Sequence, residues 1–151
     1  MFGLPDGVAA CLFDMDGVIT QTAVVHAAGI STAIVSSSAN TQLILDSAGP
    51  AELFDVRVDG VIAKEHGLRG KPAPDTLLAA AEALHVPASR AVVFEDALAG
   101  VEAGRAGHFA LVAGVDRVGQ AQELKEHGAD IVVQDLAELL GQDGQPDKGA
   151  P

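Results

Sequence analysis

The stretch Val8-Ala9-Ala10-Cys11-Leu12-Phe13-Asp14-Met15-Asp16-Gly17-Val18-Ile19-Thr20 joins an apolar run to two aspartates spaced two residues apart. The run predicts a buried strand, and in an extended segment residues i and i+2 face the same side. The charges of Asp14 and Asp16 would repel each other unless a cation lies between them or one carboxyl holds a proton. Gly17 permits a sharp turn directly afterwards. Taken alone, the pattern fits either a metal and phosphate site or a solvated, Asp-rich turn.

Length and composition limit the class of protein. The 151 residues, 48% of them hydrophobic, predict one globular domain with a sizeable core. The aromatic residues are five Phe without Trp or Tyr, so the core must be mainly aliphatic, as in a parallel sheet covered by helices. Cys11 lies within the apolar run, which predicts a buried structural thiol.

The charge of the chain bears on its partners and location. The net charge is −12 and the first basic residue is Arg57, which argues against nucleic acid or an anionic membrane as a main partner. The N-terminus lacks the basic start of a signal peptide, and no apolar stretch is long enough to span a bilayer. We therefore expect a cytoplasmic protein, either a monomer or a weak homo-oligomer.

Short apolar runs alternate with Ala- and Leu-rich helical patterns, which predicts an α/β fold with a parallel sheet. The expected strands are Val8–Phe13, Thr32–Val35, Val56–Val58, Ala91–Phe94, Ala110–Val112 and Ile131–Val132. The expected helices are Thr22–Ala28, Thr41–Ala48, Pro74–Leu84, Ala97–Ala106, Ala121–His127 and Leu136–Leu140. We expect residues 1–140 to form the domain and residues 141–151, which are poor in apolar side chains, to form a disordered tail.

Polar clusters follow three of the expected strands, where ligands bind in such sheets. Asp14 and Asp16 follow the first. Ser36-Ser37-Ser38-Ala39-Asn40-Thr41 follows the second and opens a helix, where hydroxyls and free backbone N–H groups suit either a phosphate or an ordinary N-cap. Glu95 and Asp96 follow a later strand and could bind Mg²⁺ or cap the next helix.

A further element is Gly70-Lys71-Pro72-Ala73-Pro74-Asp75, in which two prolines stiffen the segment that carries Lys71. A lysine ammonium suits a phosphate oxygen, although a Pro-rich helix entry with an exposed lysine is an equally plain interpretation of this element alone. Together, the four elements supply a nucleophile, metal ligands, donors for phosphate oxygens and a proton donor for the leaving group. Phosphoryl transfer needs all of these parts.

These motifs resemble those of the haloacid dehalogenase (HAD) superfamily, in its β-phosphoglucomutase-like branch. The match includes residues 13–20, 35–41, 70–75 and 94–96, followed by Ala99-Gly100-Val101 and Ala103-Gly104, and it covers the chain from about Val8 to Leu140. The resemblance implies a three-layer, Rossmann-like parallel sheet with helices on both faces. It also implies a Mg²⁺-dependent enzyme acting on small phosphorylated substrates through an aspartyl phosphate.

The resemblance assigns roles to the matched residues. Asp14 would be the nucleophile, and Asp16 the general acid and base, with its backbone carbonyl also on the metal. Ser36 would bind the transferring phosphoryl group, and Lys71 would neutralise charge between that group and Asp14.

The remaining matched residues would bind metal or substrate. Asp96, supported by Glu95, would complete a Mg²⁺ site with Asp14 and Asp16. Backbone N–H groups around Ser37 would assist with the phosphate, and Asn40 would contact a second phosphate or the substrate.

One departure is clear. Members of this branch carry a helical cap domain between the first two motifs, whereas only Gln21–Ser31 separates Thr20 from the next strand here. A core without a cap favours hydrolysis of phosphate monoesters. A sugar-phosphate mutase, a catalytically weak core and a receiver-type phosphoacceptor module are the alternatives, and the receiver is disfavoured because one strand carries both Asp14 and Asp16.

Overall fold

The computed structural model describes residues 4–5, 7–13, 25, 28–36, 54–116, 118–134 and 138. Within them lies a six-stranded sheet in the order β3-β2-β1-β4-β5-β6, and every neighbouring pair is parallel. The strands are β1 (Ala10–Phe13), β2 (Ser31–Val35), β3 (Val56–Val58), β4 (Ala91–Glu95), β5 (Leu111–Val115) and β6 (Ile131–Val133). This confirms the predicted parallel α/β sheet.

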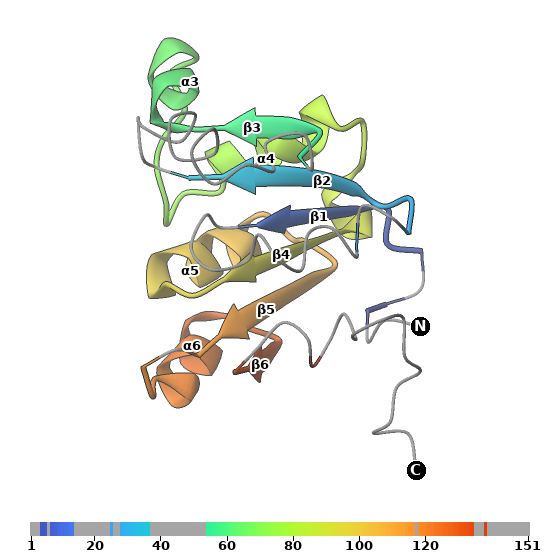
Figure 1. Cartoon of the computed structure of the whole chain (residues 1–151). Helices are drawn as coiled ribbons and strands as arrows, with labels where there is room; N and C mark the ends of the chain where they lie inside the picture. The colour runs from blue at the N-terminus through green and yellow to red at the C-terminus, as the bar shows by residue number, and fades with distance from the viewer. Residues whose placement is uncertain are drawn as a thin grey trace, which may run out of the picture.

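The order in which strands are added to the sheet reverses between β1 and β4. From β1 the chain builds outward through β2 to β3, then returns to place β4 on the other side of β1. In Figure 1 all the strand arrows point to the same side, so the carboxyl ends of β1, β2 and β4 form one edge. In a sheet of this order, ligands bind at that edge, where the strand order reverses.

The helices that the structure describes are α3 (Gly60–Glu65), α4 (Asp75–Ala83), α5 (Leu98–Ala106) and α6 (Ala121–His127), with a 3₁₀ turn at Ala88–Arg90. The last three match the predicted Pro74–Leu84, Ala97–Ala106 and Ala121–His127. The predicted helices Thr22–Ala28, Thr41–Ala48 and Leu136–Leu140 lie largely outside the described residues, although Val25 and Glu138 are helical.

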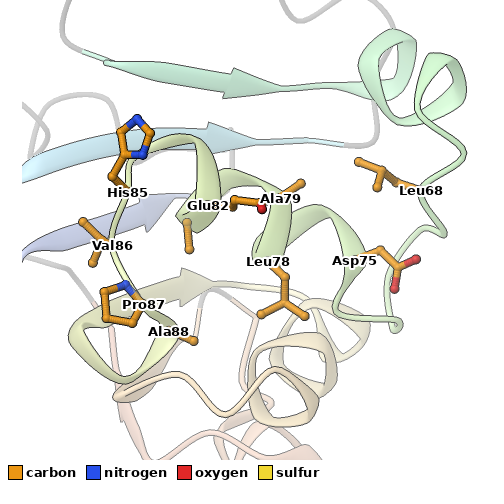
Figure 2. Close-up of a pocket in the computed structure, with 10 residues that line it drawn as sticks. Leu68, Asp75, Leu78, Ala79, Glu82, His85, Val86, Pro87 and Ala88 are labelled. Carbon is orange, nitrogen blue, oxygen red and sulfur yellow. The ribbon is translucent and has the colours of Figure 1, made fainter.

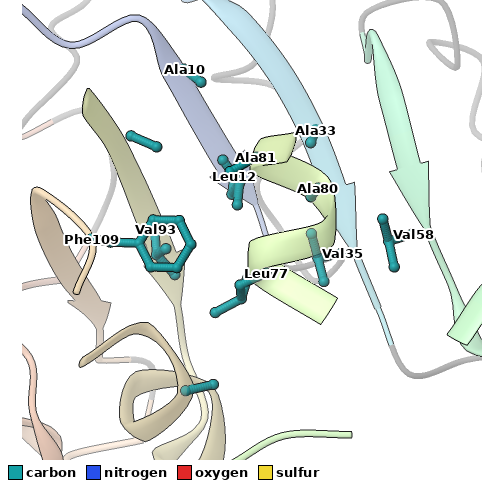
Figure 3. Packing of buried hydrophobic residues seen from close by; sticks show 12 residues of the cluster. Ala10, Leu12, Ala33, Val35, Val58, Leu77, Ala80, Ala81, Val93 and Phe109 are labelled. Atoms are coloured by element: carbon teal, nitrogen blue, oxygen red, sulfur yellow. The ribbon is translucent and has the colours of Figure 1, made fainter. Parts of the chain in front are cut away.

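Helix α4 packs over β3, β2 and β1, on one half of the sheet. Its buried Leu77, Ala80 and Ala81 belong to one cluster with Leu12 of β1 and Val35 of β2 (Figure 3). Because alanine side chains are short, the helix can lie close to the strands. The opposite face of the sheet carries a second apolar cluster, which includes the helical residue Val25 and the side chains of Cys11, Phe13, Ile34, Phe54 and Phe94. Helical residues therefore contribute to the packing of both faces.

The prediction for Cys11 is confirmed. Its side chain is 0% exposed, and burial raises the pKa of the thiol to about 12. The thiol therefore stays protonated at neutral pH and packs as a small apolar group.

Two details differ from the sequence prediction. Strand β5 runs to Val115 instead of ending at Val112, because Gly114 lets the side chains of Leu124 and Ala129 pack closely on the strand. Helix α3 was not predicted, since it buries no side chain. It depends instead on Asp59, whose carboxylate accepts a hydrogen bond from the backbone N–H of Ile62 at 2.9 Å.

Candidate active site

The ends of β1 and β4 are held together just before their acidic residues. Phe13 and Phe94 are partners in the parallel register, and their rings stack with centroids 5.0 Å apart. The next residue after Phe94 is Glu95, and the next residue after Phe13 in the chain is Asp14. Asp14, Asp16, Ser37 and Asn40 lie outside the described residues, so their assigned roles stay predictions.

Ser36 follows β2 at the same edge. Its backbone N–H donates a hydrogen bond to the carbonyl of Val58 at 2.9 Å, which extends the β2–β3 pairing by one residue. The side chain is half-buried at the carboxyl end of the strand. The structure thus places Ser36 where the sequence predicted it, next to the end of the central strand β1.

Lys71 reaches across this edge. Its ammonium contacts the Glu95 carboxylate and donates a hydrogen bond to the backbone carbonyl of Val35 at 3.4 Å. Val35 ends β2 and Glu95 ends β4, so the lysine spans the two strands that flank β1. Of the four described site residues, the structure brings Lys71 and Glu95 into direct contact. Asp96 follows Glu95 in the chain, and Ser36 follows Val35, whose carbonyl accepts the hydrogen bond from Lys71.

The loop that carries Lys71 is fastened by a second ion pair. The Asp75 carboxylate accepts three hydrogen bonds from Arg69, at 3.0 Å from its backbone N–H and at 3.1 and 3.0 Å from its guanidinium group. These hydrogen bonds hold the pKa of Asp75 below its ordinary value. The two ends of the segment 69–75 are thereby tied together, which limits where Lys71 can move.

Glu95 is a deeply buried acid. It is 2% exposed, and its burial raises the pKa of the carboxyl, an effect that the nearby Lys71 ammonium partly offsets. A buried carboxylate is costly unless a cation accompanies it. A positive charge nearby therefore stabilises the Glu95 carboxylate. Lys71 supplies one such charge, and a metal ion could supply another.

The donor set fits Mg²⁺, which prefers carboxylate oxygens and keeps several waters. Glu95 and Asp96 are adjacent acids at the carboxyl end of β4. Among the described residues there is no group of three or more His, Cys, Asp or Glu side chains that could hold a metal ion. The further acidic ligands that the resemblance implies, Asp14 and Asp16, lie outside the described residues.

Asp96 is supported by a residue that the sequence analysis missed. The Gln120 side-chain amide donates a hydrogen bond to the backbone carbonyl of Asp96 at 3.0 Å. Gln120 follows a turn in which the Asp116 carboxylate accepts hydrogen bonds from the backbone N–H groups of Val118, Gly119 and Gln120. An aspartate with a glycine three residues later could have signalled this turn, but the contact with Asp96 depends on how β5 lies beside β4.

The structure also contains an open apolar cavity of about 660 Å³ beside α4. Figure 2 shows its lining, which comes from α4, from the chain that follows this helix and from Leu68. None of Ser36, Lys71, Glu95 and Asp96 lines it. Among the described residues, the cavity therefore shares no predicted site side chain with the candidate active site.

The chain belongs to the family of haloacid dehalogenase-like hydrolases, whose pattern matches residues 23–108. Curated relatives include a β-phosphoglucomutase of Mycobacterium bovis, 54% identical over 83% of this chain and 49% of that protein. A trehalose-phosphate phosphatase of Mycobacterium leprae is 36% identical over 90% of this chain and 33% of its own length. The chain thus spans about half the length of the curated mutase it matches.

A solved structure shares the fold. A HAD family hydrolase from Deinococcus radiodurans, with bound phosphate and sodium, is 32% identical and has a TM-score of 0.70, over 82% of this chain and 56% of that one. The relatives and the solved structure support the predicted resemblance to phosphomutases and phosphatases of this family and disfavour the receiver-type alternative.

The connection between β1 and β2 is short. β1 ends at Phe13 and β2 begins at Ser31, so residues 14–30 form the whole link. Domains typically need at least about 50 residues. No cap domain of the expected kind can lie in this link.

Of the helices in the described part of the chain, none is long and apolar enough to cross a membrane.

Proposed function

We propose that this chain is a Mg²⁺-dependent phosphatase of small phosphate monoesters, sugar phosphates among them, which works through an aspartyl phosphate on Asp14. The observation that carries the proposal is the position of Lys71. The Lys71 ammonium lies at the edge of the sheet where the strand order reverses, beside the buried Glu95 and its chain neighbour Asp96. The loop that carries it is held by the ion pair of Arg69 and Asp75. Phosphoryl transfer depends on this kind of preset positive charge.

The proposed reaction has two steps. An Asp14 oxygen attacks phosphorus, the ester P–O bond breaks, and Asp16 gives its proton to the leaving alkoxide. Asp16 then takes a proton from water, whose oxygen attacks phosphorus and releases inorganic phosphate, which regenerates the Asp14 carboxylate. Ser36, with N–H groups near Ser37, would hold the phosphoryl oxygens.

Lys71 would stabilise the negative charge on those phosphoryl oxygens throughout the reaction. Asp14, the Asp16 carbonyl, Glu95 and Asp96 would hold Mg²⁺, which supplies additional positive charge when bound. Asn40 would contact a second phosphate or the substrate. Because the link 14–30 is too short to supply a cap domain that would exclude water, hydrolysis is favoured over return of the phosphoryl group to a sugar.

A mutase is the second candidate, because the β-phosphoglucomutase of M. bovis is 54% identical. A mutase must keep water away while a bisphosphate intermediate reorients in the site, a task that suits a closing domain.

We further propose that the chain acts in the cytoplasm as a monomer or weak homo-oligomer. Nucleic acid and membranes are not proposed as partners, given the net charge of −12.

Phosphate release from a panel of sugar phosphates and an aryl phosphate, with Mg²⁺ or with EDTA, tests the function. Asp14→Asn is the matched control, since the amide is nearly the same shape but cannot attack phosphorus. We expect release only with Mg²⁺ and only from the unchanged chain. Substantial turnover by Asp14→Asn would remove Asp14 from its role, and conversion of a sugar 1-phosphate to the 6-phosphate without phosphate release would favour the mutase.

A further inference from the structure

The carboxylate of Glu95 lies against the bare backbone of Gly100 in the first turn of α5. A Cβ placed on Gly100 would overlap Cδ, Oε1 and Oε2 of Glu95. All three atoms belong to the carboxylate group itself. The charged end of Glu95 therefore occupies the space that any other residue at position 100 would fill.

This carboxylate has little freedom to move aside. Glu95 is fully buried at the end of β4, and its carboxylate contacts the Lys71 ammonium. The lysine in turn reaches the carbonyl of Val35, and its loop is tied by Asp75 and Arg69. A shift of the carboxylate would therefore disturb either the ion pair or the packing of the strand end.

A second glycine of α5 provides a contrast. A Cβ on Gly104 would meet only apolar side chains among its nearest atoms, Val112 at 3.0 and 3.3 Å and Val93 at 3.5 Å. Gly104 therefore allows close packing of α5 on the sheet and has no charged neighbour of this kind. The two glycines lie one helical turn apart but face different surroundings.

We propose that Gly100 is a positioning residue of the active site. Its missing side chain leaves a notch in α5 that seats the Glu95 carboxylate, and this seat determines where the Lys71 ammonium lies between the ends of β2 and β4. The functional consequence rests on the proposed function, in which Lys71 faces the phosphoryl group and Glu95 faces Mg²⁺. The seat itself is a property of the fold and can be tested without catalysis.

The test compares Gly100→Ala with Gly104→Ala, each with and without Glu95→Asp. Both alanines favour the helix, because Ala is a better helix former than Gly. Aspartate is one methylene shorter than glutamate, so it draws the carboxylate back from position 100. In the unchanged chain and in Gly104→Ala, Glu95→Asp should lower the melting temperature in EDTA, because it pulls the carboxylate away from Lys71. In Gly100→Ala it should raise the melting temperature, because it relieves the overlap.

The same proteins are then titrated with Mg²⁺, and the dissociation constant is read from the rise in melting temperature. Gly100→Ala should weaken Mg²⁺ binding about tenfold or more, in the range found for residues that orient metal ligands. Gly104→Ala should leave it unchanged, and Glu95→Asp should restore part of it only in the Gly100→Ala chain. A purely structural glycine would not produce this pattern.

The proposal is overturned if Glu95→Asp is equally harmful beside both alanines. It is also overturned if Gly100→Ala fails to fold and Glu95→Asp does not rescue it, since the damage would then lie outside the Glu95 seat. If the stability reversal appears but the unchanged chain releases no phosphate from any ester, the seat stands and the proposed phosphatase fails.

Discussion

Replacing Lys71 with Met should separate the structural role of this lysine from its catalytic one. Methionine has a similar length and no charge, so Lys71→Met leaves the Glu95 carboxylate buried without its partner. The side chains of Lys71 and Glu95 are 15% and 1% exposed. Breaking a buried ion pair costs about 3–5 kcal/mol, and the partial exposure of Lys71 favours the lower end, about 3 kcal/mol. For a domain of this size, that cost corresponds to a melting temperature about 10 °C lower.

The assay is urea and thermal unfolding at pH 7 in EDTA, on the unchanged chain, Lys71→Met, Glu95→Gln and the double variant. The double variant buries a neutral amide in place of the carboxylate, so it should regain most of the lost stability. Phosphate release should be absent from Lys71→Met and from the double variant alike. If Lys71→Met lies within about 0.5 kcal/mol of the unchanged chain, the buried pair does not carry the stability that we assign to it.

Three further predictions concern the metal, the β5–α6 turn and the substrate range. Mg²⁺ should raise the melting temperature of the unchanged chain, and Asp96→Ala should lose most of that rise; an unchanged response would place the ion elsewhere. Backbone N–H groups, that of Gln120 foremost, lower the pKa of Asp116 from its ordinary value near 3.8. The carboxylate therefore stabilises the fold fully above pH 3.8, and this contribution is lost as the pH falls through the lower folded pKa. Asp116→Asn should thus lower the melting temperature at pH 7 and converge with the unchanged chain in acid; a constant difference at all pH values would contradict this. Across unlike phosphate monoesters, kcat/KM corrected for leaving-group reactivity should vary by no more than about two orders of magnitude, roughly 3 kcal/mol in barrier, because binding comes mainly from the phosphate. A much stronger preference for one sugar phosphate would indicate a pocket for the rest of the substrate.

Local patterns were sufficient to predict most of the described elements. The limits of β3 and α6 agree with the sequence prediction. The limits of the others, except β5, differ from it by one or two residues at one or both ends: β1, β2, β4, β6, α4 and α5. Each of these segments combines an apolar pattern with a clear terminal signal, and such signals act over a few residues. Helix α3 lacked an apolar pattern, and β5 contains a glycine that only its tertiary neighbours explain.

The candidate site was likewise predictable from the sequence only in part. The sequence alone determined which residues follow the strands, and parallel strands place their carboxyl ends at one edge; this was enough to select Ser36, Glu95 and Asp96. Lys71 was selected from the segment 70–75, in which two prolines stiffen the chain. The roles of Asp14, Asp16, Ser37 and Asn40 stay predictions on the same basis.

Only the tertiary structure decided how the site residues are paired and supported. The contact of Lys71 with Glu95 joins positions 24 residues apart. The hydrogen bond from Gln120 to Asp96 likewise joins distant segments. The notch at Gly100 also arises only when α5 packs against the end of β4. The first two contacts join elements that are far apart in the chain, and the third depends on how α5 packs back against the end of β4. Strand and helix patterns, in contrast, arise from neighbouring residues. The sequence therefore predicts which groups are present at the edge, and the packed fold determines which of them touch.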